Sequence, residues 1–164
     1  MACRGVHFAL SDQQRAELLA TVESQGDVID FIQEEIEEPW DTPWLCETDK
    51  AWDAIHRCLT DGTLSMDNST PFHWCVLNGS QLYTGDDYIV SFVDVADVKQ
   101  VYNAIASLSE EAFRARYKTI DEADYGMPTS DEDFQYTWSY FTALRDFYGR
   151  AAAADRSVLF SVDQ

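Results

Sequence analysis

Three stretches of the chain carry the hydrophobic pattern of β-strands. Residues 4 to 10 alternate apolar side chains with His7, which predicts a short strand with His7 in the core or at an edge. Residues 88 to 93 read YIVSFV and residues 157 to 162 read SVLFSV, and both are rich in β-branched or aromatic residues. Because these strands are far apart in the sequence, they must pair through long-range contacts.

Most other hydrophobic residues recur every three or four positions, as on one face of an α-helix. Residues 11 to 14 read SDQQ, which places a glutamine where a capping box requires it. Pro39 is expected to end the second helix. The predicted helices begin at Ser11, after Asp27, at Asp49 (ending near Gly62), after Asp94 and at Ser109, and the longest runs from about Ser130 to Ala153.

Two segments have a less regular pattern. Residues 37 to 49, EEPWDTPWLCETD, hold two prolines and two tryptophans, which predicts a packed loop. Residues 71 to 85 fit either a short helix or a strand followed by a turn at Asn78 and Gly79. A further loop is expected through Gly126, before the longest helix.

The order of these elements predicts an α+β fold. At 164 residues the chain is long enough for one sizeable hydrophobic core and needs no second domain. We therefore expect a single compact domain over residues 1–164, with several helices packed on a small mixed sheet.

Charge narrows the classes of partner. Thirty acidic residues face eleven basic ones, a formal net charge of −19. Such a protein repels nucleic acid and anionic membranes and attracts cationic partners. The same acidity also serves solubility, or reflects the salt or the genome composition of the host, and the sequence leaves these interpretations open.

Several classes of site and location are disfavoured. No apolar run approaches the ~20 residues of a membrane-spanning helix, and the first ten residues lack the apolar stretch of a signal peptide, so a cytoplasmic location is predicted. The seven glycines form no phosphate-binding loop. The four cysteines have no metal-ligand spacing and are expected as free thiols, so neither a metal site nor a cofactor is predicted: Cys3, Cys46, Cys58 and Cys75.

A few residues are candidates for catalysis. Asp53 and His56 are three positions apart and share a face of a helix, where a carboxylate can orient an imidazole as a general base. His73 and Cys75 face the same side if their segment is extended, and with His56 or Cys58 nearby they could form a Cys/His nucleophile or a metal site, although their spacing does not require either. The alternative is that Asp53 and His56 tie their helix to its surroundings.

The segment from Glu23 to Asp49 is the best candidate for partner binding. It carries ten acidic residues and no lysine or arginine. The segment also holds Trp40 and Trp44. In a protein interface, aromatic side chains contribute affinity, and charged side chains contribute association rate and specificity. The alternative is a solvated helix face with its tryptophans packed in the core. The candidate residues are Asp30, Glu34, Glu35, Glu37, Glu38, Trp40, Asp41 and Trp44.

The stretch DKAWDAIHRCLT resembles the D-K-x-W-D-x-I/L-H-x-x-L-T signature of the YfbM-like family of small bacterial proteins, a domain of unknown function. The resemblance extends over nearly the whole chain and implies a compact mixed α/β domain with no established activity. Where the family tends to have a glycine pair, this chain has Asn78 and Gly79, which puts a close backbone approach there in doubt. The matching positions are Asp49, Lys50, Trp52, Asp53, His56, Leu59 and Thr60.

Three hypotheses about function follow. The first is a non-catalytic, acidic protein-binding module, such as an immunity or antitoxin-like protein that masks a cationic toxin; the lack of a catalytic motif favours it over an enzyme. The second is a small enzyme or ligand-binding domain that uses Asp53 and His56, which requires these side chains to meet in a pocket with His56 partly exposed and its pKa perturbed. The third is acidity imposed by the host, with a partner unrelated to charge. Oligomeric state is not predicted.

Overall fold

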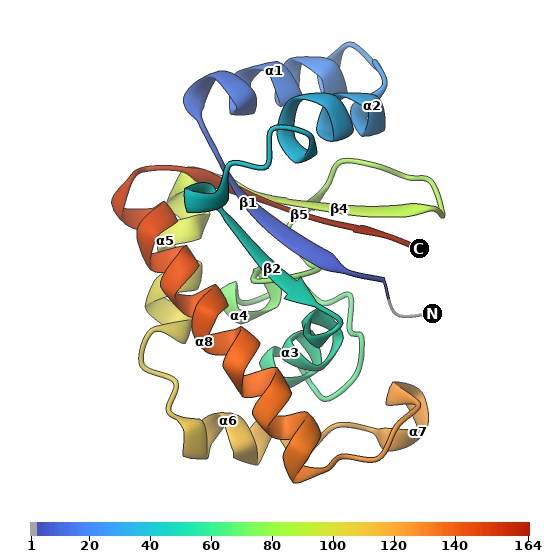
Figure 1. The fold of residues 1–164 in the computed structure, drawn as a ribbon, viewed down its shortest axis with the longest axis vertical. Helices are drawn as coiled ribbons and strands as arrows, with labels where there is room; N and C mark the ends of the chain where they lie inside the picture. Colours follow the sequence, from blue (N-terminus) through green and yellow to red (C-terminus); the bar gives the residue numbers. More distant parts are fainter. Residues whose placement is uncertain (1–2) are drawn as a thin grey trace.

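A five-stranded sheet lies at the centre of the fold (Figure 1). The computed structural model describes residues 3–164, so Met1 and Ala2 lie outside the description. The sheet order is β2-β1-β5-β4-β3 and every pairing is antiparallel, so the predicted α+β class is confirmed although the sheet is not mixed. The strands are β1 (Gly5–Leu10), β2 (Leu45–Asp49), β3 (Ser80–Gln81), β4 (Tyr88–Val93) and β5 (Ser157–Asp163).

The strand β5 is the middle of the sheet. It pairs with β1 from Val6 opposite Ser161 to Leu10 opposite Ser157, and with β4 on its other side. Its first six residues are buried, because helices cover both faces of the sheet. A strand covered on both faces is expected to have an almost continuous run of hydrophobic residues. The three predicted strands are therefore the three central ones.

The helices follow the sequence expectations closely. Ser11 forms a complete capping box with Gln14, and Asp27, Asp94, Ser109 and Ser130 each accept a hydrogen bond from a backbone N–H of the helix that they precede. Their bounds are α1 (Asp12–Glu23), α2 (Val28–Ile32), α3 (Ala51–Leu59), α4 (Pro71–Trp74), α5 (Val95–Ile105), α6 (Glu110–Tyr117), α7 (Glu122–Tyr125) and α8 (Asp131–Ala153).

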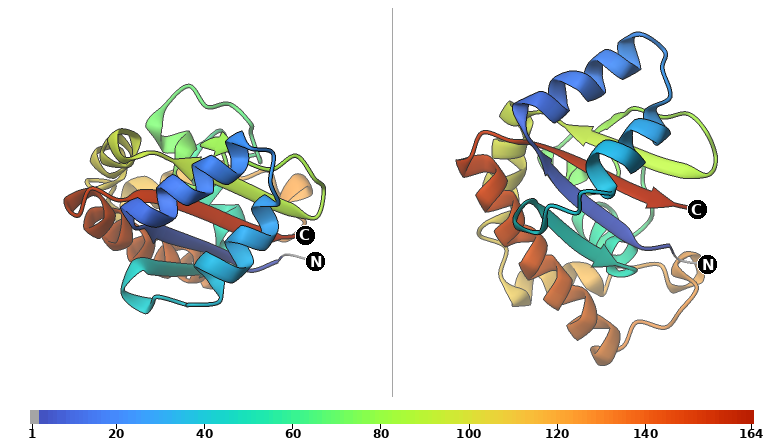
Figure 2. Two further views of the ribbon diagram at one scale, coloured as in Figure 1. Left: turned by 90° about the horizontal axis from the view of Figure 1, so that it is seen from above. Right: turned by 45° about the horizontal axis from the view of Figure 1, so that its top comes forward.

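Helices cover both faces of the sheet (Figure 2). On one face, α1 and α2 pack through Leu18, Ile32 and their neighbours against Phe8 and Leu159. On the other face, α3, α5, α6 and α8 enclose a larger core. Because β1 alternates its side chains, Phe8 enters the first core and Ala9 enters the second.

Three segments differ from the sequence expectations. The expected packed loop of residues 37 to 49 contains a 3₁₀ turn, η2 (Thr42–Trp44), and then the edge strand β2. Asp49 does not cap α3: it ends β2 with φ 44° and accepts a hydrogen bond from Tyr136, and Lys50 stands at the N-cap without a side-chain bond. The helix α2 continues into a π-helical turn, η1 (Gln33–Glu37), before Pro39.

Candidate functional site

The signature helix α3 is almost wholly buried between the sheet and the other helices. Its buried residues include Trp52, Ile55 and Leu59, as its helical periodicity predicts. The indole Nε1 of Trp52 donates to the carbonyl of Cys3 at 2.9 Å, which ties α3 to the segment before β1. The hydroxyl of Thr60 donates to the carbonyl of His56 at 2.9 Å, and this bond satisfies a carbonyl at the end of the helix.

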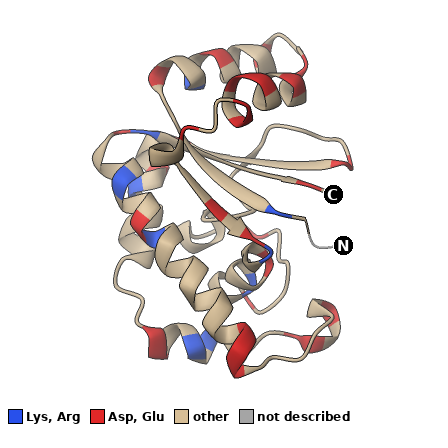
Figure 3. Cartoon of the chain, in the orientation of Figure 1, with Lys and Arg blue, Asp and Glu red and all other residues tan. Residues whose placement is uncertain are grey.

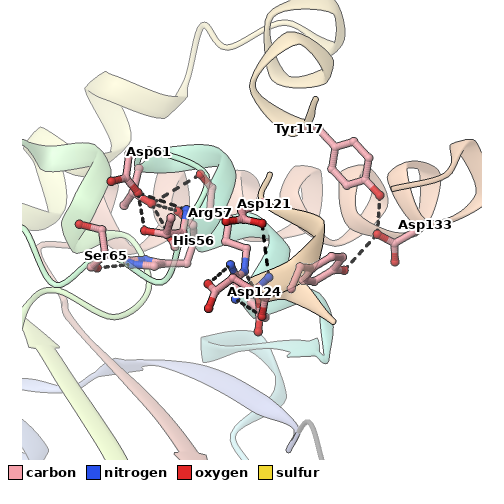
Figure 4. A network of polar contacts seen from close by, with 12 residues as sticks. His56, Arg57, Asp61, Ser65, Tyr117, Asp121, Asp124 and Asp133 are labelled. Atoms are coloured by element: carbon pink, nitrogen blue, oxygen red, sulfur yellow. Dashed lines mark hydrogen bonds and ion pairs between the residues drawn. The ribbon is translucent and has the colours of Figure 1, made fainter. Parts of the chain in front are cut away.

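Asp53 pairs with an arginine instead of the expected histidine. The Oδ1 of Asp53 accepts a hydrogen bond from Nε of Arg57 at 2.6 Å, and Nη1 of Arg57 donates to Asp124 at the same distance (Figure 4). The Arg57 side chain is only 2% exposed. Burial raises the pKa of the Asp53 carboxyl, and the hydrogen bond and positive charge of Arg57 oppose this shift.

The ion pairs of Arg57 belong to a larger network that joins four helices. The guanidinium of Arg57 lies over the ring of Tyr125, 5.5 Å from its centroid. The hydroxyls of Tyr117 and Tyr125 both donate to Oδ2 of Asp133, at 2.5 and 3.0 Å (Figure 4). The side chains therefore connect α3, α6, α7 and α8, and they fix the short helix α7 onto the domain.

His56 is enclosed and serves the loop that follows its helix. It is 0% exposed, and its Nε2 donates to the carbonyl of Ser65 at 2.9 Å. Asn78 donates to the same carbonyl and to that of Asp67, at 2.6 and 2.7 Å. Burial lowers the pKa of His56 from 6.5 to about 4, although its bond to Ser65 acts in the opposite direction.

The structure does not bring the two candidate catalytic residues of α3 into contact with each other. Asp53 and His56 lie on one helix but bond to different partners, and His56 is buried and not partly exposed. A general base needs access to the proton that it removes, and a fully enclosed imidazole has none. Asp53 and His56 therefore make two separate ties, one to Arg57 of the same helix and one to the loop after it.

His73 and Cys75 do not form a Cys/His unit. Their segment is not extended: His73 lies on α4 and Cys75 follows directly after that helix. The carbonyl of Cys75 accepts hydrogen bonds from Nε2 of His7 and from the hydroxyl of Tyr148, at 2.9 and 2.7 Å. Burial raises the pKa of the Cys75 thiol well above its ordinary value, so the thiolate that nucleophilic chemistry needs is disfavoured.

The predicted partner-binding residues divide into exposed and internal ones. Glu37 is half-buried and accepts a hydrogen bond from Ser161 at 2.8 Å, and the half-buried ring of Trp44 is covered by the guanidinium of Arg156, 3.7 Å from its centroid. Trp40 is 40% exposed, with one edge toward Phe8. The remaining residues, which we call the acidic surface together with Trp40, are exposed: Asp30, Glu34, Glu35, Glu38 and Asp41.

No cation neutralises this surface within residues 3–164. None of its carboxylates lies within 4.0 Å of a lysine, arginine or histidine nitrogen. Arg15, on α1, is already paired with Asp94 through two hydrogen bonds of 2.8 and 2.7 Å. Figure 3 shows acidic residues along α1 and α2 and again on α7 and at the starts of α6 and α8, whereas lysine and arginine lie mainly on the layer of α5, α6 and α8.

The described part of the chain, residues 3–164, holds no group of three or more His, Cys, Asp or Glu side chains placed to bind a metal ion. It also holds no helix that is both long enough and apolar enough to span a bilayer.

A family model described as a domain of unknown function, DUF1877, matches residues 1–161. The chain belongs to this family. The DUF1877 chain is also similar to a solved structure from Escherichia coli, described as YfbM, a protein of unknown function. The two share 18% sequence identity with a TM-score of 0.71, over 97% of this chain and 99% of the other. A search of curated proteins finds no match.

The family match and the similar fold confirm the predicted YfbM-like resemblance. In this DUF1877 chain, the signature residues Trp52 and His56 make hydrogen bonds that hold α3 in place. Asp53, also in the signature, bonds to Arg57 of the same helix. Sequence reasoning missed Arg57, whose signal was its position four residues after Asp53 on the same helix face. It also missed the role of Asn78, which bonds to two backbone carbonyls of the loop between α3 and α4. No sequence spacing signals such a contact.

Proposed function

We propose that this protein is a non-catalytic, cytoplasmic binding module that uses the acidic surface to hold a cationic protein. The finer form of the proposal is an immunity-type role, in which the bound protein is a toxin with a basic active cleft. The observation that carries the proposal is a set of exposed, unneutralised carboxylates beside an exposed tryptophan.

The charge distribution supports a protein partner of opposite sign. From Ala16 to Asp49 the chain has no lysine or arginine, and no carboxylate of the acidic surface is in an ion pair with another described residue. A cleft or face of one sign steers an oppositely charged partner and raises the association rate. A nuclease cleft that binds phosphates is rich in lysine and arginine, which is the complementary chemistry.

The backbone of the acidic surface also supports a binding role. Trp40 has φ 46°, a left-handed conformation that is an outlier for a bulky residue and costs of the order of 1 kcal/mol or more. The preceding turn η1 is π-helical, with the N–H of Glu38 bonded to the carbonyl of Gln33 at 2.8 Å. Strained residues and π-helical turns are both frequent at functional sites.

The test uses any basic protein that is encoded next to this gene. Each is purified and titrated by calorimetry with the wild-type protein at about 0.05 M and about 0.3 M salt. The site variant reverses three charges of the acidic surface: Glu34→Lys, Glu35→Lys and Glu38→Lys. The control variant makes the same change of net charge on α6 and α8: Glu110→Lys, Glu111→Lys and Glu132→Lys.

We expect a complex whose affinity falls with salt, that is lost in the site variant and that survives in the control variant. Trp40→Ala should lower the affinity of this complex at least about tenfold. A bound toxin must also lose its activity in the complex; binding without this loss supports the module but rejects the immunity role. Equal weakening by both triple variants, or no salt-sensitive complex, rejects the proposal and leaves the acidity as an adaptation to the host.

A further inference from the structure

A groove lies at one end of the acidic surface, between the turn that joins α1 to α2 and the hairpin that joins β3 to β4. It has a volume of about 880 Å³ and is open to solvent. On one side its lining includes Val22 of α1, Asp27 of the turn and Asp30 of α2, and on the other side it includes Leu82, Tyr83 and Asp87 of the hairpin. Asp30 belongs both to this groove and to the acidic surface.

The groove combines two kinds of side chain that rarely suit the same ligand. Val22, Leu82 and Tyr83 are half-buried and offer apolar surface, whereas Asp27, Asp30 and Asp87 are exposed carboxylates. No lysine or arginine lines it. A side chain with an apolar stem and a cationic head matches both features, because the stem covers the apolar surface while the head meets the carboxylates.

The hairpin wall is built so that an aromatic ring and a carboxylate act together. The hydroxyl of Tyr83 donates to Oδ1 of Asp87 at 2.8 Å. The Tyr83 ring also lies so close to Gly85 that an added Cβ would meet it at 2.3–2.5 Å, so any side chain at position 85 would displace the ring. An aromatic ring fixed beside a carboxylate favours arginine, whose planar guanidinium stacks on rings and pairs with carboxylates.

We infer that this groove receives an arginine-bearing segment of the cationic partner, with apolar residues beside its arginines. The inference rests on the proposed function and extends it, because it assigns specificity to the hairpin, which lies outside the acidic surface. The acidic surface then attracts the partner through charge, and the groove selects arginine with apolar neighbours.

The probe is an acetylated and amidated peptide of alternating arginine and leucine, compared with one of alternating lysine and serine. Binding is followed by amide chemical shifts and by fluorescence anisotropy. The groove variant combines Asp27→Asn, Asp30→Asn and Asp87→Asn, which removes three charges and keeps an acceptor for Tyr83 and a cap for α2. The control combines Glu110→Gln, Glu111→Gln and Glu132→Gln, and Leu82→Gln tests the apolar surface alone.

We expect the arginine–leucine peptide to shift amides of both groove walls and to bind more tightly than the lysine–serine peptide. The groove variant and Leu82→Gln each lower its affinity by roughly tenfold, and the control lowers it much less. Equal affinity for the two peptides, equal loss in the control, or shifts confined to residues 34 to 41 overturn the inference. In the last case the proposed function stands, because the peptide still binds the acidic surface.

Discussion

His7 and His56 are held neutral inside the protein by different parts of the fold. Burial lowers the pKa of each from 6.5 to about 4, and each donates one hydrogen bond to a backbone carbonyl. Neither imidazole can take up a second proton without placing a charge in the core. Their contribution to stability therefore depends on pH.

Between pH 6.5 and about 4 the unfolded chain binds protons at these histidines that the folded protein does not bind. The stabilisation is complete above pH 6.5 and is lost as the pH falls toward 4. We expect the free energy of unfolding to drop over this range by up to about 3 kcal/mol for each histidine. Urea unfolding at a series of pH values measures the drop, and His56→Gln should flatten the curve relative to wild type; an unchanged slope contradicts the assignment.

Two glycines with positive φ provide a matched pair. Gly62 has φ 91° and its missing Cβ would lie 2.3 Å from the carbonyl oxygen of Thr119, whereas Gly126 has φ 79° and open space around it. Gly126→Ala should cost only the backbone strain, about 1 kcal/mol. Gly62→Ala should cost clearly more, because the loop around Thr119 must also move. Thermal unfolding compares the two, and equal shifts in Tm would show that the clash is relieved without cost.

The sequence predicted individual residues well where local chemistry sets their role. Ser11, Asp27 and Ser130 were identified as helix starts because a cap bonds within three residues along the chain. Asp49 was also predicted to be a helix cap, but it does not cap α3. Its carboxylate instead accepts a hydrogen bond from the hydroxyl of Tyr136, which is far away in the sequence. His56 and Asn78 bond to carbonyls of the irregular loop between α3 and α4, 9 to 13 positions away, and no local rule predicts the path of that loop.

Among the elements, α7 depends most on one side chain. It has only four residues, too few for a helix to be stable alone, and Arg57 of α3 binds its Asp124. The buried guanidinium and Asp53 compensate each other's charge. Removing one partner of such a pair leaves the other without compensation.

We expect Arg57→Met to lower the free energy of unfolding by about 3–5 kcal/mol and to expose the loop of α7 to proteases. The double variant Arg57→Met with Asp53→Asn should recover part of this loss, because it removes the uncompensated carboxylate. As a control, Lys99→Met removes an exposed ion pair to Asp155 and should cost less than about 1 kcal/mol. Urea unfolding and limited proteolysis measure the effects. If Arg57→Met costs no more than Lys99→Met, the network does not hold α7.

Element prediction succeeded for the central strands and failed for the edge strands. β4 and β5 are rich in apolar residues because both faces of the sheet are covered. β2 has only two adjacent apolar residues, Leu45 and Cys46, before the exposed Glu47, and β3 consists of two exposed residues, so neither has a hydrophobic run. Both segments are strands because each forms hydrogen bonds with a longer neighbouring strand. The amino-acid composition of a segment does not show whether it has such a neighbour.

For the whole molecule, the net charge of −19 acts against the compact state through mutual repulsion of carboxylates. We expect the free energy of unfolding to rise with salt, because screening reduces this repulsion. The variant Glu34→Gln, Glu35→Gln and Glu38→Gln should be at least as stable as wild type and less dependent on salt. Urea unfolding at low and high salt tests both points. A marked loss of stability in this variant would show that these carboxylates serve the fold and not a partner.

The position of β5 has a consequence for synthesis. The middle strand of the sheet is the last to leave the ribosome, and β1 and β4 make no direct ladder with each other. Until Ser157–Asp163 emerge, the nascent chain has a gap where the sheet should be continuous, and the earlier strands have open edges. Folding of this domain must therefore follow translation of nearly all its residues, and a chain that stops before β5 is a substrate for chaperones and proteases.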